Sequence, residues 1–218
     1  MISKGSVAVV MNQRGVKWQP RPSIAFRAAI LLAMIVGALG CGPKFGGAGS
    51  FPAASTANCL PDITLVDQNG RAVSLASLKG RPVLVDFIYT ECPGPCLMLT
   101  AKMVNTAKLL RTQMGTQVQL LSISIDPAHD TPAALSRYAK AQDANMNGWL
   151  FLTGSSQQID DVLARYNLQR AVQSNGLIDH VVEFFLLGSN GRQLRQYAAT
   201  EVTPDTLAAD VRVAIARG

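Results

Sequence analysis

Residues 82–96 read PVLVDFIYTECPGPC, and this stretch decides the fold. Its first half, Pro82 to Tyr89, is a β-branched and aromatic run with the length and composition of a strand buried on both faces. The second half ends in Cys92-Pro93-Gly94-Pro95-Cys96, and apolar residues then recur at helical spacing at positions 97, 99, 103, 104, 107 and 110. The sequence therefore predicts two cysteines at a strand-to-helix junction.

A hairpin is predicted before this stretch. Asp62 to Val66 alternates as a short strand, and Gln68-Asn69-Gly70-Arg71 places Asn-Gly at the centre of a turn. The chain then returns into Val73 and Leu75 as the second strand. These residues predict an N-terminal β-hairpin extension of the domain.

Strands and helices alternate after the cysteines. Val118 to Ile125 reads as a second buried strand, and Thr131-Pro132 reads as the start of a helix with Thr as N-cap and Pro in the first position. The further elements expected are a strand at 149–152, a helix at 155–166, a hairpin of 181–187 with 192–197, and a helix at 203–217. Parallel strand–helix–strand units followed by a hairpin and a terminal helix predict an α/β, thioredoxin-like fold.

Cys92 and Cys96 are four residues apart at the mouth of the predicted helix, where unpaired amide groups and about half a positive charge favour thiolates. A helical i, i+4 relation would put the two side chains ~5–6 Å apart, close enough to chelate one metal ion or to close a disulfide. Outside the cytosol, a structural disulfide is the simplest alternative. The carboxyl end of a strand is, however, where open α/β sheets bind ligands, which favours a functional pair.

The chain has two histidines. His129 lies in a turn rich in Asp and Pro, residues 126–132, and is expected to be a solvated loop residue. His180 precedes a predicted strand, and in a thioredoxin-like order this position faces the cysteine loop; a hydrogen-bonded histidine at a strand start is the alternative. Asp179 is a candidate to orient His180 by accepting its second ring N–H, with a plain surface carboxylate as the alternative.

Two thiolates and one imidazole form a ligand set that suits Cu(I) in three-coordination and can also hold Cu(II). A closed structural zinc site would usually require a fourth ligand. The residue types at Cys92, Cys96 and His180 therefore predict a copper site.

Three stretches resemble the Sco/SenC family of copper chaperones: Phe87 to Cys96 (FIYTECPGPC), Ser124 to Pro132 (SIDPAHDTP), and Asp179-His180 before an apolar strand. The similarity runs from about Leu60 to the end of the chain. The resemblance implies a thioredoxin fold, a membrane-attached domain in the periplasm or mitochondrial intermembrane space, and copper bound by the two cysteines and the histidine. It also implies a role in delivering copper to the dinuclear copper centre of cytochrome c oxidase, or in keeping the cysteines of that centre reduced. The expected partner is thus the oxidase subunit that holds this centre or another copper-handling protein.

Two positions depart from the family pattern. Leu97 stands where that family usually has Pro, and Val181 stands where it usually has Ser. Neither position supplies a ligand, so the departures bear on the identity of the partner more than on metal binding.

Two enzymatic alternatives compete with a carrier that performs no chemical transformation. In a thiol–disulfide oxidoreductase, Cys92 would attack and Cys96 would resolve, so that the pair forms a redox-active disulfide. Such enzymes usually have two residues between the cysteines and a cis-proline opposite, whereas this chain has three residues there and no proline between Pro132 and Pro204. A thiol peroxidase is the weaker alternative, because Thr90 is two residues before Cys92 where a peroxiredoxin has three. We therefore expect a chaperone rather than an enzyme.

Residues 1–41 have the layout of a signal peptide or membrane anchor. Up to Gly40 there are five cations and no carboxylate, and Ala28 to Leu39 is an unbroken apolar or small run. The small residues before Cys41 indicate lipidation of that cysteine, and an uncleaved apolar anchor is the alternative. Residues 42–57, mostly Gly, Ala, Ser and Pro, predict a flexible tether to a domain at 58–218. We expect the bacterial inner membrane, with the domain facing the periplasm.

The formal charge of +6 is concentrated in this leader, since the rest of the chain has fifteen Lys and Arg against fourteen Asp and Glu. A nearly neutral domain with no basic stripe argues against nucleic-acid binding. Cys59, just before the domain's first strand, is either a free thiol or the partner of Cys41 in a disulfide across the tether.

Overall fold

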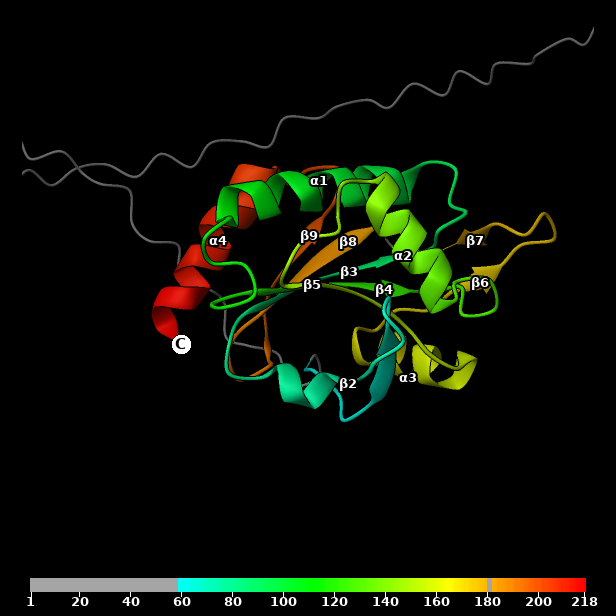
Figure 1. Cartoon of the computed structure of the whole chain (residues 1–218), viewed down its shortest axis with the longest axis horizontal. Helices are drawn as coiled ribbons and strands as arrows, with labels where there is room; N and C mark the ends of the chain where they lie inside the picture. Colours follow the sequence, from blue (N-terminus) through cyan, green and yellow to red (C-terminus); the bar gives the residue numbers. More distant parts are fainter. Residues whose placement is uncertain (1–58, 180–181) are drawn as a thin grey trace, which may run out of the picture. The chain divides into compact units, whose positions relative to one another are not determined.

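The computed structural model describes residues 59–179 and 182–218. Its main feature is a seven-stranded sheet with the strand order β2-β1-β5-β4-β3-β8-β9 (Figure 1). The strands of this sheet are β1 (Thr64–Asp67), β2 (Ala72–Ser74), β3 (Val83–Ile88), β4 (Gln119–Ser124), β5 (Trp149–Thr153), β8 (Glu183–Leu187) and β9 (Gln193–Ala198). The helices are η1 (Leu75–Leu78), α1 (Pro95–Leu110), α2 (Pro132–Ala141), α3 (Ser156–Arg165) and α4 (Pro204–Arg217).

The centre of the sheet is parallel, as predicted. β3 pairs with β4 from Val83 opposite Gln119 to Ile88 opposite Ser124, and β4 pairs in parallel with β5. Every residue of β3 and β4 is buried, because helices cover both faces of these strands. The apolar runs around positions 82–89 and 118–125 therefore form the strands that they predict.

The outer strands are antiparallel. β8 pairs with β3 and with β9, and β1 pairs with β2 and with β5. The N-terminal hairpin is confirmed, but its return strand ends at Ser74. Leu75 instead opens the 3-10 helix η1, so its prediction as a strand residue was wrong. Leu75 and Leu78 are both buried, and their spacing of three places them on one side of a 3-10 turn.

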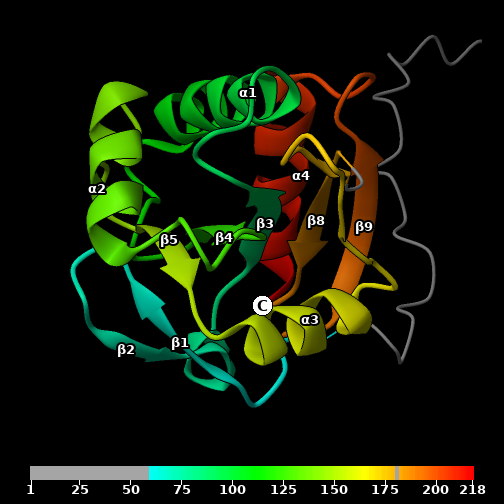
Figure 2. The ribbon, with the colours of Figure 1, turned by 90° about the vertical axis from the view of Figure 1, so that its right-hand side faces the viewer.

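The helices form a layer on each face of the sheet, with α1, α2 and α4 on one side and α3 on the other (Figures 1 and 2). Aromatic contacts identify the two faces. Phe87 packs edge-on against Tyr166, at the end of α3, and against Phe185. On the opposite face, Phe151 stacks with Trp149 and contacts Tyr138 of α2. Because successive side chains of a strand alternate between faces, Asp86 points to the side of α1 and α2.

Side-chain caps define where three helices begin. Thr131, Ser155 and Thr203 each accept a hydrogen bond from the backbone N–H three residues later. The prediction that Thr131-Pro132 starts a helix is therefore confirmed, as is the start of α4 at Pro204.

A short second hairpin lies between α3 and β8. It consists of β6 (Ala171–Val172) and β7 (Ile178–Asp179), paired antiparallel around a turn in which Gly176 has a φ of +82°. The sequence does not predict this hairpin, because strands of two residues leave no periodic signal. This hairpin matters here because β7 ends directly before His180.

Candidate functional site

Cys92 and Cys96 lie together at the carboxyl end of β3. Cys96 is in the first turn of α1, whereas Cys92 is in the turn that precedes the helix, so the predicted helical i, i+4 relation is wrong. The structure brings the two residues together in another way, since the backbone N–H of Cys96 donates to Sγ of Cys92 over 3.3 Å. Both cysteines are thiols, with exposed fractions of 6% for Cys92 and 0% for Cys96.

Burial controls the acidity of the second thiol. Desolvation raises the pKa of Cys96 far above its ordinary value, and the side chain of Cys92 and the charge of Asp86 raise this pKa further. Cys96 is therefore protonated at neutral pH. It must lose a proton before it can bind a metal ion or attack a disulfide.

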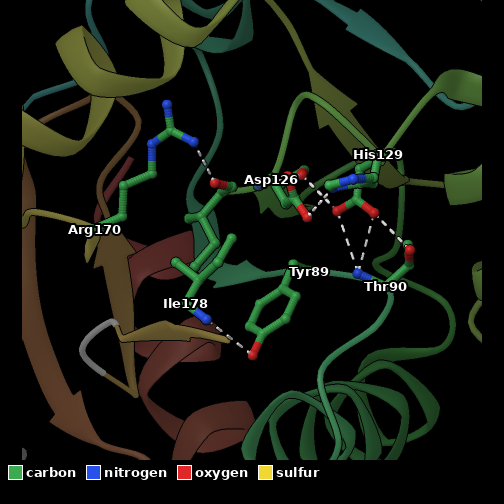
Figure 3. A network of polar contacts seen from close by, with 9 residues as sticks. Tyr89, Thr90, Asp126, His129, Arg170 and Ile178 are labelled. Atoms are coloured by element: carbon green, nitrogen blue, oxygen red, sulfur yellow. Dashed lines mark hydrogen bonds and ion pairs between the residues drawn. The ribbon is translucent and has the colours of Figure 1, made fainter. Parts of the chain in front are cut away.

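The cysteine loop is tied to the next strand by Asp130. The carboxylate of Asp130 accepts hydrogen bonds from the backbone N–H and the hydroxyl of Thr90 and from Oγ of Ser124 at 2.6 Å (Figure 3). Asp130 is buried, and this burial raises the pKa of its carboxyl group. The segment 126–132 thus has a structural role through Asp130, which also fixes Thr90, two positions before Cys92.

His129 is a solvated loop residue, as expected. Its side chain is 66% exposed, and Nδ1 lies 2.8 Å from Oδ2 of Asp126 (Figure 3). This hydrogen bond and the charge of Asp126 raise the pKa of His129. The ring points into solvent and does not contact the cysteines.

The β6–β7 hairpin is anchored beside the cysteine loop. The backbone N–H of Ile178 donates to the hydroxyl of Tyr89 over 3.4 Å, and Arg170 donates to the carbonyl oxygen of Ile125 over 2.8 Å (Figure 3). Arg170 also forms an ion pair with Asp160 at 2.8 Å. Sequence reasoning missed both anchors, since they join residues 89 and 45 positions apart and carry no local pattern.

Two predicted site residues, His180 and Cys41, lie outside the described residues. Asp179 is exposed, and its carboxylate accepts a hydrogen bond from Nε2 of Gln173 across the hairpin at 2.6 Å. Its predicted role in orienting His180 stays a prediction. Within residues 59–179 and 182–218, no three His, Cys, Asp or Glu side chains form a group that could hold a metal ion.

Cys59 lies away from the site. It is a half-buried thiol that forms an isolated antiparallel bridge with Arg192, next to the turn between β8 and β9. The disulfide with Cys41 concerns a residue outside the described part of the chain and stays a prediction. The same holds for the leader and the tether. In the part that the structure describes, no helix has both the length and the apolar character of a membrane span.

Sequence reasoning also missed Asp86. It is the one charged residue in the apolar run of Pro82 to Tyr89, a signal that could have marked it. Asp86 is fully buried in β3, and desolvation raises its pKa from 3.8 to about 7, with the Ser122 side chain offsetting part of this effect.

Comparison with known proteins agrees with the fold and the motifs. Residues 52–216 match the SCO1/SenC family model. The chain is 36% identical to the SCO1 protein homolog of Bacillus subtilis over 69% of its own length and 80% of the relative's. It is 32% identical to a SCO2-like protein of Rickettsia conorii, over 62% and 67% of the two chains.

Solved structures show the same architecture. ScoI of Bradyrhizobium japonicum, solved with copper bound, is 29% identical and superimposes with a TM-score of 0.62 over 72% of this chain and 99% of its own. A SCO1/SenC family lipoprotein of Bacillus anthracis, 24% identical, gives a TM-score of 0.68 over 76% and 99% of the two chains. The predicted thioredoxin-like fold with its N-terminal hairpin is confirmed, and the chain belongs to the SCO1/SenC family.

Proposed function

We propose that this protein is a copper metallochaperone that carries copper between Cys92, Cys96 and His180 and passes it to a copper-handling partner. The observation that supports this most directly is the cysteine pair itself. The two sulfurs belong to residues joined by the Cys96 N–H to Cys92 Sγ hydrogen bond, at the carboxyl end of a central strand. Thiolates of this kind are the soft ligands that Cu(I) prefers.

The position of β7 supports the histidine as the third ligand. The Ile178 N–H bonds to Tyr89, three residues before Cys92, and His180 follows directly on β7. A histidine delivered from this hairpin completes a ligand set of two thiolates and one imidazole. Copper here is the cargo of the protein, so the ligands must both hold it and release it by exchange with the partner's ligands.

Relatives support copper as the metal. Bradyrhizobium japonicum ScoI was solved with copper bound, and BsSco, 30% identical to this chain, is described as a member of the Sco family of cytochrome c oxidase assembly proteins. By analogy, the recipient we propose is the dinuclear copper centre of cytochrome c oxidase. Cu(I) is the form that we expect to be carried, because two thiolates and an imidazole favour it.

We propose that a membrane anchor formed by residues 1–41, lipidated at Cys41 or left uncleaved, holds the domain on the periplasmic side of the bacterial inner membrane. Residues 42–57 would act as the tether between anchor and domain. A recipient that is itself a membrane protein would then lie within reach of that tether.

A thiol–disulfide oxidoreductase is the second candidate function. It is favoured by the Cys96 N–H that donates to Sγ of Cys92, because a donor at this sulfur stabilises a thiolate there. A disulfide switch was identified in the relative BsSco. The same pair could serve both functions, since a copper donor's thiolates are also reductants.

A copper titration of the full reduced chain in detergent tests the proposal. Cu(I) is added anaerobically in competition with a chromogenic Cu(I) chelator, to the wild type and to His180→Ala, Cys92→Ser and Cys96→Ser. The matched controls are His129→Ala, which removes the other, exposed histidine, and Cys59→Ser, which removes a thiol outside the site.

We expect one Cu(I) per chain in the wild type and both controls, and loss of competition with the chelator in the three site variants. If His180→Ala retained wild-type affinity, the three-ligand site would be wrong. If Cys92→Ser and Cys96→Ser also retained it, the function as a copper carrier would be wrong altogether.

A further inference from the structure

Four segments of the chain meet at the end of the sheet opposite the cysteines, where β3 and β4 begin and β8 ends. They are residues 79–82, 108–118, 188–192 and 212–218. One residue from each segment lines a common hollow of the surface: Arg81, Gln117, Ser189 and Ile215. The four segments therefore form one continuous surface.

This surface is basic. Its four segments contain seven Lys or Arg and no Asp or Glu: Lys79, Arg81, Lys108, Arg111, Arg192, Arg212 and Arg217. Six of the seven are exposed, and Arg81 is half-buried. Arg81 and Arg212 donate hydrogen bonds to the carbonyl oxygens of Gly115 and Leu109, which leave their positive charge in place. We call this surface the basic end. The sequence shows no basic stripe because these residues come from four separate segments.

The end of the domain that bears the cysteines has the opposite charge. It is formed by residues 89–94, 125–131, 171–179 and 198–206. These segments contain six Asp or Glu and no Lys or Arg: Glu91, Asp126, Asp130, Asp179, Glu201 and Asp205. Figure 1 shows the β6–β7 hairpin at this end of the domain and the last residue of α4 at the other. A domain with a net charge close to zero thus has two ends of opposite charge.

Helix dipoles account for only some of the cations at the basic end. Lys108 and Arg111 lie at the C-terminal end of α1 and Arg217 in the last turn of α4, where positive charge offsets the negative end of the helix dipole. Lys79 and Arg192 lie in loops, outside any helix. The complete lack of carboxylates in the four segments is likewise not required by the dipoles.

The chain that precedes the domain joins it at the basic end. Cys59 forms a bridge with Arg192, and the backbone N–H of Leu60 donates to the carbonyl oxygen of Gly191 over 3.0 Å. Both contacts are made to the segment 188–192. A membrane anchor in the leader would therefore be connected to the domain on its basic side, away from the cysteines.

A surface of this charge is attracted to anionic lipid headgroups. Each Lys or Arg close to an anionic bilayer favours the bound state by about fivefold, and the attraction acts within a Debye length of the surface. The cysteine end, with its carboxylates, is repelled by the same bilayer. Attraction at one end and repulsion at the other favour a single orientation of the domain.

We propose that the basic end rests on the anionic lipid headgroups of the membrane that holds the anchor. The bilayer is recognised through its phosphate charge, by loops and helix ends rather than by a closed pocket. The cysteine end then faces away from the bilayer, where it is open to a partner. This orientation rests on the proposed anchor of residues 1–41 and does not depend on which metal ion the cysteines bind.

Energy transfer from Trp149 to the lipid surface tests this orientation. Trp149 is the first residue of β5, at the same end of the sheet as the four basic segments. The full chain, with Trp18→Phe so that Trp149 is the single tryptophan donor, is reconstituted into vesicles that carry a dansyl group on a few headgroups. One set of vesicles is phosphatidylcholine alone, and the other is equal parts phosphatidylcholine and phosphatidylglycerol.

Two triple variants with the same change in net charge are compared. The basic-end variant removes three exposed cations of this surface: Lys79→Gln, Lys108→Gln and Arg192→Gln. The matched control removes three cations that lie outside the four segments, in the first hairpin and on α2: Arg71→Gln, Arg137→Gln and Lys140→Gln. Circular dichroism shows whether each variant is folded.

We expect the wild type to transfer more energy in the anionic vesicles than in phosphatidylcholine, and high salt to remove this difference. In the basic-end variant, the equilibrium constant for resting on the anionic surface should fall about a hundredfold, so its transfer should be equal in both vesicles. The control variant should keep the wild-type difference. Equal transfer from the wild type in the two vesicles would overturn the proposal. So would a control variant that loses as much as the basic-end variant, because net charge alone would then explain the effect.

Flotation of the same vesicles separates this proposal from the proposed anchor. A chain that does not float with phosphatidylcholine vesicles has no membrane anchor. The basic end is then supported if the chain floats with the anionic vesicles and the basic-end variant does not, and it is refuted if neither floats. A chain that floats with both kinds of vesicle but transfers energy equally in them keeps its anchor and refutes the basic end alone.

Discussion

Replacement of Asp86 by Asn should change how the stability of the protein depends on pH. Burial raises the pKa of Asp86 from 3.8 to about 7 in the folded chain, so the folded state binds a proton between these values that the unfolded state has already lost. The stabilisation that protonated Asp86 contributes is therefore fully present below about pH 4, and it is lost as the pH rises to about 7. The rise in pKa corresponds to about 4 kcal/mol of unfolding free energy, an upper figure for this fully buried group.

The assay is urea unfolding followed by far-ultraviolet circular dichroism, at half-unit steps from pH 4 to pH 8. The unfolding free energy of wild type minus that of Asp86→Asn should fall by up to about 4 kcal/mol across this range and level off above pH 7. The other titratable groups are present in both proteins, so their contributions cancel in the difference. Asp86→Leu serves as a second neutral variant, whose absolute stability differs from that of Asp86→Asn but whose unfolding free energy should change with pH in the same way. If the wild type and the two variants gave parallel curves, the argument that Asp86 is buried with a raised pKa would be refuted.

Three further predictions concern the frame around the site. Asp130→Ala should lower the unfolding free energy by about 3 kcal/mol, because it leaves buried donors without an acceptor, and should speed alkylation of the cysteines in the native protein. Gly148→Ala should lower the free energy of unfolding by about 3 kcal/mol or more, because a Cβ at this position would lie 2.1 Å from a backbone nitrogen. Gly70→Ala should lower it by only about 1 kcal/mol, because Gly70 has a φ of +79° but no atom within 4 Å of the added Cβ. Chemical unfolding of the two variants measures both effects. Arg170→Gln should remove the hydrogen bond from the start of the β6–β7 hairpin to Ile125, the residue after β4, so hydrogen exchange at the Ile178 amide should become faster with little change in global stability.

The central elements were predictable because their signals are local. The apolar runs around β3 and β4 leave no alternative to buried strands, and Thr-Pro pairs mark the starts of α2 and α4. The cysteines were placed correctly at a strand-to-helix junction for the same reason. The prediction was wrong about the detailed geometry of the two cysteines, which are not both in the helix. Pro93 and Pro95 delay the helix, so Cys92 stays in the turn and meets Cys96 through a backbone hydrogen bond.

Long-range contacts left no trace in the sequence. The hydrogen bonds from Ile178 to Tyr89 and from Thr90 to Asp130 join residues that are far apart in the sequence and become neighbours only in the folded protein. The β6–β7 hairpin has strands of two residues, too short for a periodic pattern. Asp86 could have been noticed as a lone charge within an apolar run, but its meaning depends on which face of β3 it occupies. That face is known only once the register and the helix layers are known.

In the proposed copper carrier, ligand exchange and proton loss concern two differently exposed residues, Cys92 before α1 and Cys96 in its first turn. Exchange with a partner's ligands must occur from outside, where Cys92 keeps a small exposed area and the neighbouring Leu97 is 41% exposed. Proton movement must occur inside, because the thiol of Cys96 has no exposed surface through which solvent could take its proton.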